Sequence, residues 1–530
     1  MTSQSSAPLP ERPNLEQLKK QAKSLLHAAR AADTNALERF RLLPAFAGKS
    51  VAELGAAGLA LHDAQSVIAR EHGFESWNAL REHVEERSLS FAAAVDEFVR
   101  CATGSAAARA MRLLALHPAI AHANLYTELV LGDAEAVRER LRAQPALATQ
   151  SGGVQDWEPL LYVCHTCLNR ERPALADGLV AIARELLDRG ANPNAEYHWQ
   201  WHAELPRTAL WGALCGTNHL PLAETLLERG ANPTDGVSLH ITAGGGILPA
   251  LELLARFKVD PNGIPGGVPP LRYLLSWADT PIGARWLLEH GADPNLAWSQ
   301  HGDAPIHVAA QRWGVEMMEL LAQHGADLHE RRTDGRTALT LAELHGNEAV
   351  AAWLRARGAK DELSPLERFA AACCRGDRAS ADAMLRSNPQ LRDQLLTEHH
   401  LMMHVPAERG DAAVLETMLT CGFDPNVRDH DGVTSLHRSA IAGRAEATRV
   451  LIAHGATVDA LDGMFAGTPL LWAAEGWRHA PRPGVDHVAV ARLLIAAGSP
   501  TTWIPPEKAP DPESTQETLL ELCRAAGATA

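Results

Sequence analysis

One nine-residue phrase recurs along the chain and limits it to a narrow range of folds. The phrase has the form Leu-Leu-x-x-Gly-Ala-Asn/Asp-x-Asn, and its copies begin at Leu186, Leu226, Leu287, Leu320, Leu354, Leu419 and Leu451. Successive glycines of three copies, Gly291, Gly325 and Gly358, lie 34 and 33 residues apart. A fixed period of this length predicts a stack of equal units, because one such unit is too small to bury its own apolar face.

A second phrase precedes the first one in several units and has the form Thr-Pro-Leu-His-x-Ala-Ala. Copies of it begin at Ala304, Thr434 and Thr468. Threonine can cap the start of a helix, and proline suits the first helical position because no amide donor is needed there. The glycine of the first phrase can end a helix in the left-handed conformation, and the Asn-Pro pair that follows favours a turn. Each unit is therefore predicted to be a helix-turn-helix with a short hairpin finger.

Together the two phrases resemble those of the ankyrin-repeat family. The resemblance is clear over residues 157–360 and 400–503, which we expect to form two repeat blocks. It implies an all-α solenoid whose first helices and fingers line a concave face. It also implies a binding protein that holds a protein or peptide partner on that face without catalysing a reaction.

The rest of the chain departs from this pattern. Residues 14–86 resemble the helical module that precedes ankyrin repeats in many bacterial proteins, and we expect them to cap the first repeat. Residues 91–150 and 366–395 are expected to be degenerate helix pairs, and residues 513–530 a final capping helix. The irregular stretch 361–400 is expected to divide the two repeat blocks.

Composition excludes several classes of function. The chain of 530 residues has 64 acidic and 49 basic side chains and a net charge of −15, which disfavours contact with a phosphate backbone. No segment reaches the roughly 18 consecutive apolar residues of a membrane helix. Eight cysteines in so long a chain do not form a disulfide framework. We therefore expect a cytoplasmic protein that binds neither nucleic acid nor membrane, and the abundant alanine and scarce lysine indicate a bacterial genome.

Neither of two possible metal-binding patterns is expected to hold a metal ion or cofactor. Cys164 and Cys167 have the spacing of a zinc half-site, but a structural zinc ion takes four ligands and no second pair is present. His198 and His202 are four residues apart, yet they lie where a finger is predicted rather than a helix.

The histidines of the second phrase are interpreted as buried rings that bond to the backbone of the neighbouring loop. These are His240, His307, His404 and His437.

Tryptophan and tyrosine gather between residues 157 and 313. The chain has 13 tryptophans against 9 phenylalanines and 4 tyrosines, and large rings with polar tips are typical of binding surfaces. Trp286 is expected in the core and Trp211 at the repeat's histidine position. The residues predicted to bind a partner are Tyr162, His165, His198, Trp199, Trp201, His202, Tyr273, Trp277, Trp298 and His301.

An alternative hypothesis is that the same groove binds a small aromatic ligand or catalyses a hydrolase-like reaction. His198, His202, His219 and His301 are then candidate bases, with Glu196, Glu204 or Asp303 to orient them. No nucleophile elbow or cofactor fingerprint supports catalysis. A closed cavity beside the aromatic residues would favour a small molecule, an open surface would favour a protein, and burial between helices would exclude a groove.

Overall fold

The computed structural model describes residues 9–10, 13–104, 106–198, 206–264, 267–278, 280–298, 302–360, 363–463, 465–479, 485–503 and 512–527. It is mostly helical, as predicted, and its contacts divide the chain into two compact units, Met1–Ser238 and Leu239–Ala530. The division falls inside the block expected at 157–360. No helix among the described residues is long and apolar enough to cross a membrane. All eight cysteines are free thiols.

The first unit opens with a helical module that has its own hydrophobic core. Its elements are α1 (Leu15–Arg30), α2 (Thr34–Arg39), η1 (Phe40–Leu42), η2 (Pro44–Phe46), α3 (Val51–Gly55), α4 (Leu61–Glu71) and α5 (Trp77–Ser88). Asn14 caps α1 by accepting a hydrogen bond from the amide of Gln17 at 3.2 Å. The buried face of α1, which includes Leu18, Ala22 and Leu25, is the face that the spacing of apolar residues predicts. Its role as a cap stays a prediction.

Helix pairs and one finger complete the first unit. Their elements are α6 (Phe91–Thr103), α7 (Ala107–Leu116), η3 (Pro118–His122), α8 (Leu125–Val130), α9 (Ala134–Ala143), η4 (Pro145–Ala148), α10 (Pro159–His165), α11 (Leu168–Glu171), η5 (Pro173–Leu175), α12 (Ala176–Asp188), β1 (Glu196–His198), β2 (Pro206–Thr208), α13 (Ala209–Trp211), η6 (Gly212–Gly216) and α14 (Leu220–Glu228). Strands β1 and β2 pair antiparallel with Tyr197 opposite Arg207, and they form the finger between α12 and α13.

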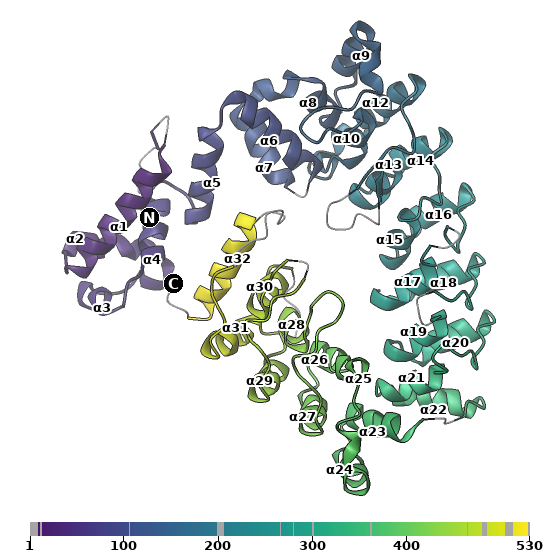
Figure 1. The fold of residues 1–530 in the computed structure, drawn as a ribbon. Coiled ribbons are helices and arrows are strands. Elements are labelled where there is room, and N and C mark those ends of the chain that lie inside the picture. The colour runs from purple at the N-terminus through teal and green to yellow at the C-terminus, as the bar shows by residue number, and fades with distance from the viewer. Residues whose placement is uncertain are drawn as a thin grey trace. The chain divides into compact units, whose positions relative to one another are not determined.

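The second unit is a stack of helix pairs. Its elements are α15 (Ser238–Gly244), α16 (Leu248–Arg256), α17 (Pro270–Trp277), α18 (Ile282–Glu289), α19 (Pro305–Arg312), α20 (Val315–Gln323), α21 (Ala338–Leu344), α22 (Glu348–Ala356), α23 (Pro365–Cys374), α24 (Arg378–Ser387), η7 (Pro389–Leu391), α25 (Thr397–Leu401), α26 (His404–Arg409), α27 (Ala412–Thr420), α28 (Ser435–Ile441), α29 (Ala445–Ala453), α30 (Pro469–His479), α31 (His487–Ala496) and α32 (Pro512–Ala525). The first helices α17, α19 and α21 pack in one row, and the second helices α20 and α22 contact each other beside it (Figure 1).

The helix ends follow the chemistry of the two phrases. Thr337 caps α21 by accepting from the amide of Thr340, and Pro305 opens α19. Gly291, Gly325 and Gly358 have φ angles of 93°, 90° and 89°, which is the left-handed conformation that ends the second helices. The helix-turn-helix unit predicted from the sequence is therefore confirmed.

The last asparagine of the first phrase ties each finger to the next one. Asn295 donates from Nδ2 to the carbonyl oxygen of Gly325 at 3.0 Å and accepts at Oδ1 from the amide of Asp327 at 2.7 Å. Asn426 makes the equivalent pair of bonds to Gly455 and Thr457. One side chain thus satisfies two backbone groups of the following unit, which explains why the residue recurs.

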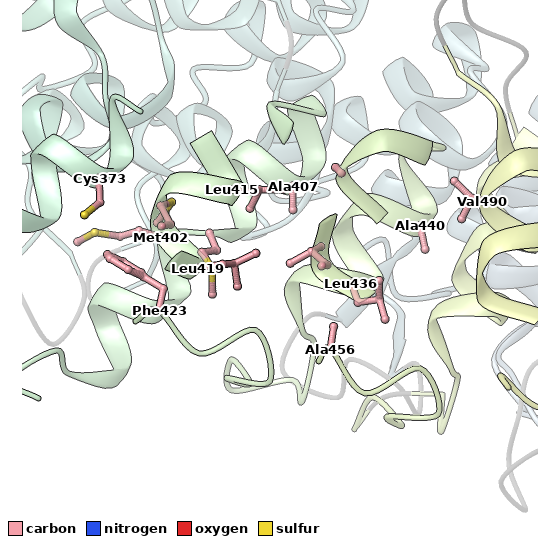
Figure 2. Packing of buried hydrophobic residues seen from close by; sticks show 14 of the residues in the cluster. Cys373, Met402, Ala407, Leu415, Leu419, Phe423, Leu436, Ala440, Ala456 and Val490 are labelled. Carbon is pink, nitrogen blue, oxygen red and sulfur yellow. The ribbon is translucent and has the colours of Figure 1, made fainter. Parts of the chain in front are cut away.

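A continuous hydrophobic core runs through the irregular stretch 361–400. Phe369 of α23 and Met403, which precedes α26, are fully buried in one cluster that extends to Leu436 of α28 and Leu470 of α30. Figure 2 shows this packing from Cys373 and Phe423 to Leu436 and Val490. The irregular stretch therefore keeps the stacked core of its neighbours.

Candidate functional site

The histidines of the second phrase are structural in three of the four positions. His307 has no exposed surface; its Nδ1 accepts from the amide of Ala304 at 3.1 Å, so Nε2 donates to the carbonyl oxygen of Glu330 at 3.0 Å. His437 bonds in the same way to Thr434 and Gly467, and His240 lies 2.7 Å from the carbonyl oxygen of Val268. Burial lowers the pKa of His307 and of His437, which keeps the rings neutral. The structural interpretation is confirmed for these three residues.

His404 does not hold this position, and the prediction for it is wrong. The unit begins earlier than the sequence pattern indicates, at α25, where His399 accepts at Nδ1 from the amide of Leu396 at 3.1 Å. His404 lies one helix later, in α26, with Nδ1 3.9 Å from a carboxylate oxygen of Asp429. Its Nε2 is buried without a hydrogen-bond partner among the described residues, and burial lowers its pKa to about 4.

The structure buries Tyr162 and His165, which corrects the prediction that they face a partner. Tyr162 is 0% exposed; its hydroxyl donates to the carbonyl oxygen of Gly152 at 2.8 Å and accepts from the amide of Gln155 at 3.0 Å. His165 is 6% exposed, with Nε2 3.2 Å from the carbonyl oxygen of Thr208. It binds the finger as the repeat histidine does elsewhere, but from one turn later in its helix. Burial lowers the pKa of His165 to about 3 and raises that of Tyr162 to about 12.

Stacked rings join the finger of the first unit to its first helices. The ring of Tyr197 on β1 stacks on Trp157 with centroids 4.1 Å apart, and His165 stacks on Trp211 at 5.7 Å. The guanidinium of Arg207 on β2 lies 4.0 Å from the Trp211 ring centroid. These rings therefore pack against one another inside the first unit.

Of the remaining predicted residues of the first unit, the structure describes only His198, at the end of β1. His198 is exposed, and its Nε2 lies 3.6 Å from a carboxylate oxygen of Glu196. Trp199, Trp201 and His202 lie outside the described residues, as does His301 in the second unit.

The second unit presents two exposed tryptophans. Trp277 at the end of α17 is 41% exposed, and Trp298 in the following finger is 38% exposed. Tyr273, one turn before Trp277, is half-buried and makes edge contacts with His240 at 5.3 Å and with Trp277 at 5.9 Å. His240, Tyr273 and Trp277 therefore form a row of rings across α15 and α17. By contrast, Trp286 is 4% exposed and lies in the core, as predicted.

Arg272 contacts one of the two exposed tryptophans, Trp298. It lies at the repeat's histidine position in α17, beside Tyr273, and its guanidinium is 5.4 Å from the Trp298 ring centroid. The backbone of Trp298 exchanges two hydrogen bonds of 3.1 Å with Asp303, which closes the finger. We name Arg272, Tyr273, Trp277 and Trp298 the exposed aromatic surface.

A row of alternating charges continues from this surface through the next three units. Asp303 lies between Arg272 at 3.5 Å and Arg332 at 3.1 Å, and Arg332 also pairs with Asp334 at 2.9 Å. Arg336 lies 3.5 Å from Asp334 and also contacts Glu367 at 2.9 Å and Glu398 at 2.7 Å, where the row ends. We name these seven residues the charged row. Sequence reasoning missed the other six residues of the row, because most of its ion pairs join residues of different units.

The described residues offer little for cofactor or metal chemistry at this surface. The carboxylate of Asp303, a candidate orienting group, is held by two guanidiniums. Cavities of about 270 and 430 Å³ in the second unit are lined by residues between 343 and 414 instead. Asp429, His430 and Asp431 bring three possible ligand atoms within 4.8 Å of one another on a surface turn. Tryptophan, tyrosine and arginine side chains are the groups that most often anchor protein partners.

Comparison with known proteins identifies the repeat. A family model described as "Ankyrin repeats (3 copies)" matches residues 281–364 and 401–502. Cyclin-dependent kinase 4 inhibitor B of Bos taurus is 34% identical over 132 residues, which are 25% of this chain and 97% of that protein. The solved ankyrin repeat domain of human ASB11 is 24% identical, with a TM-score of 0.34, over 45% of this chain and 99% of that one.

Other relatives share only a small part of their length with this chain. SH3 and multiple ankyrin repeat domains protein 2 of Homo sapiens is 29% identical over 174 residues, which are 9% of that protein. Palmitoyltransferase Hip14 of Drosophila melanogaster is 38% identical over 90 residues, 13% of its length. These relatives come from animals, so the bacterial origin expected from composition stays a prediction.

Proposed function

The chain belongs to the ankyrin-repeat family, and on that premise we propose that its second unit binds a protein partner through the exposed aromatic surface and the charged row beside it. The single observation that carries the proposal is the exposure of Trp277 and Trp298, at 41% and 38%, with the guanidinium of Arg272 5.4 Å from the Trp298 ring centroid. Leaving two indole rings in water is unfavourable, and tryptophan and arginine dominate the energetics of protein interfaces.

The charged row supplies the orientation of the partner. Its guanidiniums and carboxylates are already paired, so their positions are fixed before a partner arrives and little side-chain entropy is lost on binding. Glu398 at one end is 46% exposed on its side chain, and the Arg272 side chain at the other end is 18% exposed. A partner surface with complementary charges would be aligned along this row.

The names of relatives are consistent with this kind of function. One is a cyclin-dependent kinase inhibitor, and another, 42% identical over 50 residues, is protein phosphatase 1 regulatory subunit 12A of Mus musculus. Both names describe a protein that acts on another protein. We propose the same class of function here, with no catalysis by this chain, and we propose a cytoplasmic location for it.

Replacing both exposed tryptophans tests the proposal. We expect Trp277→Ala combined with Trp298→Ala to reduce recovery of a co-purifying protein at least tenfold, because loss of a binding anchor costs about 2 kcal/mol or more. The measurement is quantitative mass spectrometry of proteins that co-purify with the full chain from cells of its source organism.

Arg285→Ala provides the matched control. Arg285 is exposed on α18 of the same unit but belongs to the second helix, away from the proposed surface. It should leave recovery unchanged. Equal recovery with the tryptophan variant and the wild-type chain, when both are folded by circular dichroism, would refute the proposed surface.

A further inference from the structure

Sulfur collects at the stretch where the chain departs from its regular period. Residues 373–421 contain three of the eight cysteines and four of the nine methionines: Cys373, Cys374, Cys421, Met384, Met402, Met403 and Met418. All seven belong to one hydrophobic cluster or pack against it. Figure 2 shows the sulfur atoms of Cys373 and Met402 in this cluster. Thiols and thioethers are soft ligands, which favour soft metal ions such as Cu(I).

Two of these sulfur atoms meet at the wall of a cavity. Cys374, the last residue of α23, and Met402, which follows α25, both line the cavity of about 270 Å³. The Sγ atom of Cys374 lies 4.0 Å from the Sδ atom of Met402, with the thiol as a weak donor. Two sulfurs at this separation can share one metal ion at bonds of about 2.3 Å, with an S–metal–S angle of about 120°. That angle leaves room for a third ligand in the same plane.

His345 is the candidate for the third ligand. It follows α21 and lines the same cavity, and its neighbour Gly346 lies so close to α23 that a Cβ there would be 2.8 Å from the carbonyl oxygen of Cys374. The Nδ1 atom of His345 is buried and has no hydrogen-bond partner in the described part of the chain. Imidazole nitrogen is a common ligand of metal ions when it carries no proton.

The charged residues that line the cavity balance one another. Arg375 and Arg409 line it together with Glu348 and Asp411, and Arg375 is paired with Glu343 at 2.9 Å. A monovalent ion that replaces the thiol proton leaves this balance unchanged, whereas a divalent ion would add a positive charge.

We propose that His345, Cys374 and Met402 form a three-coordinate site for a monovalent soft metal ion, Cu(I). Thiolate and imidazole bind both Cu(I) and Zn²⁺, whereas the thioether of Met402 favours Cu(I), because the usual zinc ligands are thiolate, imidazole and carboxylate. On binding, the Cys374 S–H bond breaks, the thiolate bonds to the ion, and the proton leaves to solvent. The Met402 sulfur and the His345 Nδ1 donate lone pairs, and the oxidation state of copper does not change.

Competition with a coloured Cu(I) chelator, bicinchoninate, tests this site on the full-length reduced chain under anaerobic conditions. The wild-type chain should withdraw one equivalent of Cu(I) from the chelator. Cys374→Ser and Met402→Leu should each weaken binding at least tenfold, because each removes one of three donors. Cys523→Ser, which removes a buried thiol in α32, should bind like the wild type. X-ray absorption should show two sulfur ligands and one nitrogen ligand.

Two results would overturn the site. One is Cu(I) binding in Cys374→Ser that equals the wild type. The other is a loss of binding in Cys373→Ser but not in Cys374→Ser, which would assign the ion to the thiol pair of Cys373 and Cys421 in the core. Circular dichroism of every variant separates loss of the ligand from loss of the fold.

Discussion

At the scale of single residues, the recurring polar side chains act on the backbone of the next unit. His307 satisfies the amide of its own helix start and a carbonyl group of the following finger, and Asn295 does the same between two fingers. A buried backbone group without a partner costs more free energy than a made hydrogen bond returns. The regular spacing of the phrases therefore reflects contacts between units as much as the helices themselves.

Removal of Asn295 tests this role. Asn295→Ala removes the hydrogen bonds to the carbonyl of Gly325 and the amide of Asp327. Because these groups are exposed and water can replace the lost bonds, we expect the free energy of unfolding to fall by about 1 kcal/mol. Gln323→Ala, an exposed substitution on α20, is the matched control and should change it by less than about 0.5 kcal/mol. Urea unfolding followed by circular dichroism measures both. Equal stability of the two variants would contradict the role.

At the scale of elements, glycine sets how closely the second helix of one unit approaches the first helix of the unit before it. A Cβ at Gly283 of α18 would lie 1.9 Å from the carbonyl oxygen of Ala243 in α15. In the first unit, a Cβ at Gly178 of α12 would lie 2.0 Å from the carbonyl oxygen of Gly132. Since real atoms do not approach so closely, any side chain at these positions would push the two elements apart.

Gly283→Ala should therefore be strongly destabilising although alanine is the better helix former. We expect a loss of about 1–3 kcal/mol, as for other overpacked interiors, measured by the midpoint of urea unfolding. Arg285→Ala in the same helix points to solvent and should leave the midpoint nearly unchanged. An unchanged or raised midpoint for Gly283→Ala would show that α15 and α18 can separate at no cost.

At the scale of the whole molecule, each of the two compact units contains buried histidines that are neutral in the folded chain. Burial holds the pKa of His165 at about 3 and those of His345 and His404 at about 4. Below a pH of about 6.5 the unfolded chain binds protons at these rings and the folded chain does not. Each such ring then removes about 1.4 kcal/mol of stability per pH unit.

Unfolding by urea at pH 7.5, 6 and 5 measures this loss. The midpoint should be nearly constant above pH 7 and should fall between pH 6.5 and pH 5, before the carboxylates begin to titrate. His345→Gln should make the fall shallower than in the wild-type chain. A midpoint that rises or stays constant down to pH 5 would contradict the burial of neutral rings.

The fold follows from the sequence more completely than the surface does. The repeat phrases predict helix starts, left-handed helix ends and the structural histidines, because each of these recurs at the same place in the regular units. The prediction for His165 is wrong because the histidine that binds the finger in that unit lies one turn later than the pattern allows. The prediction for Tyr162 is wrong because its hydroxyl bonds to the backbone of Gly152 and Gln155. The pairing of Arg272 with Asp303 joins residues 31 positions apart, and no local pattern specifies it.

The central claim, that the exposed aromatic surface contacts a protein, is tested most directly by site-specific photo-crosslinking in living cells. A photoreactive phenylalanine analogue replaces Trp277 in one full-length variant and Arg285 in another, and adducts are resolved on denaturing gels and identified by mass spectrometry. The account predicts a discrete protein adduct from position 277 and none from position 285. Adducts of equal yield from both positions, or an adduct from position 285 alone, would contradict it.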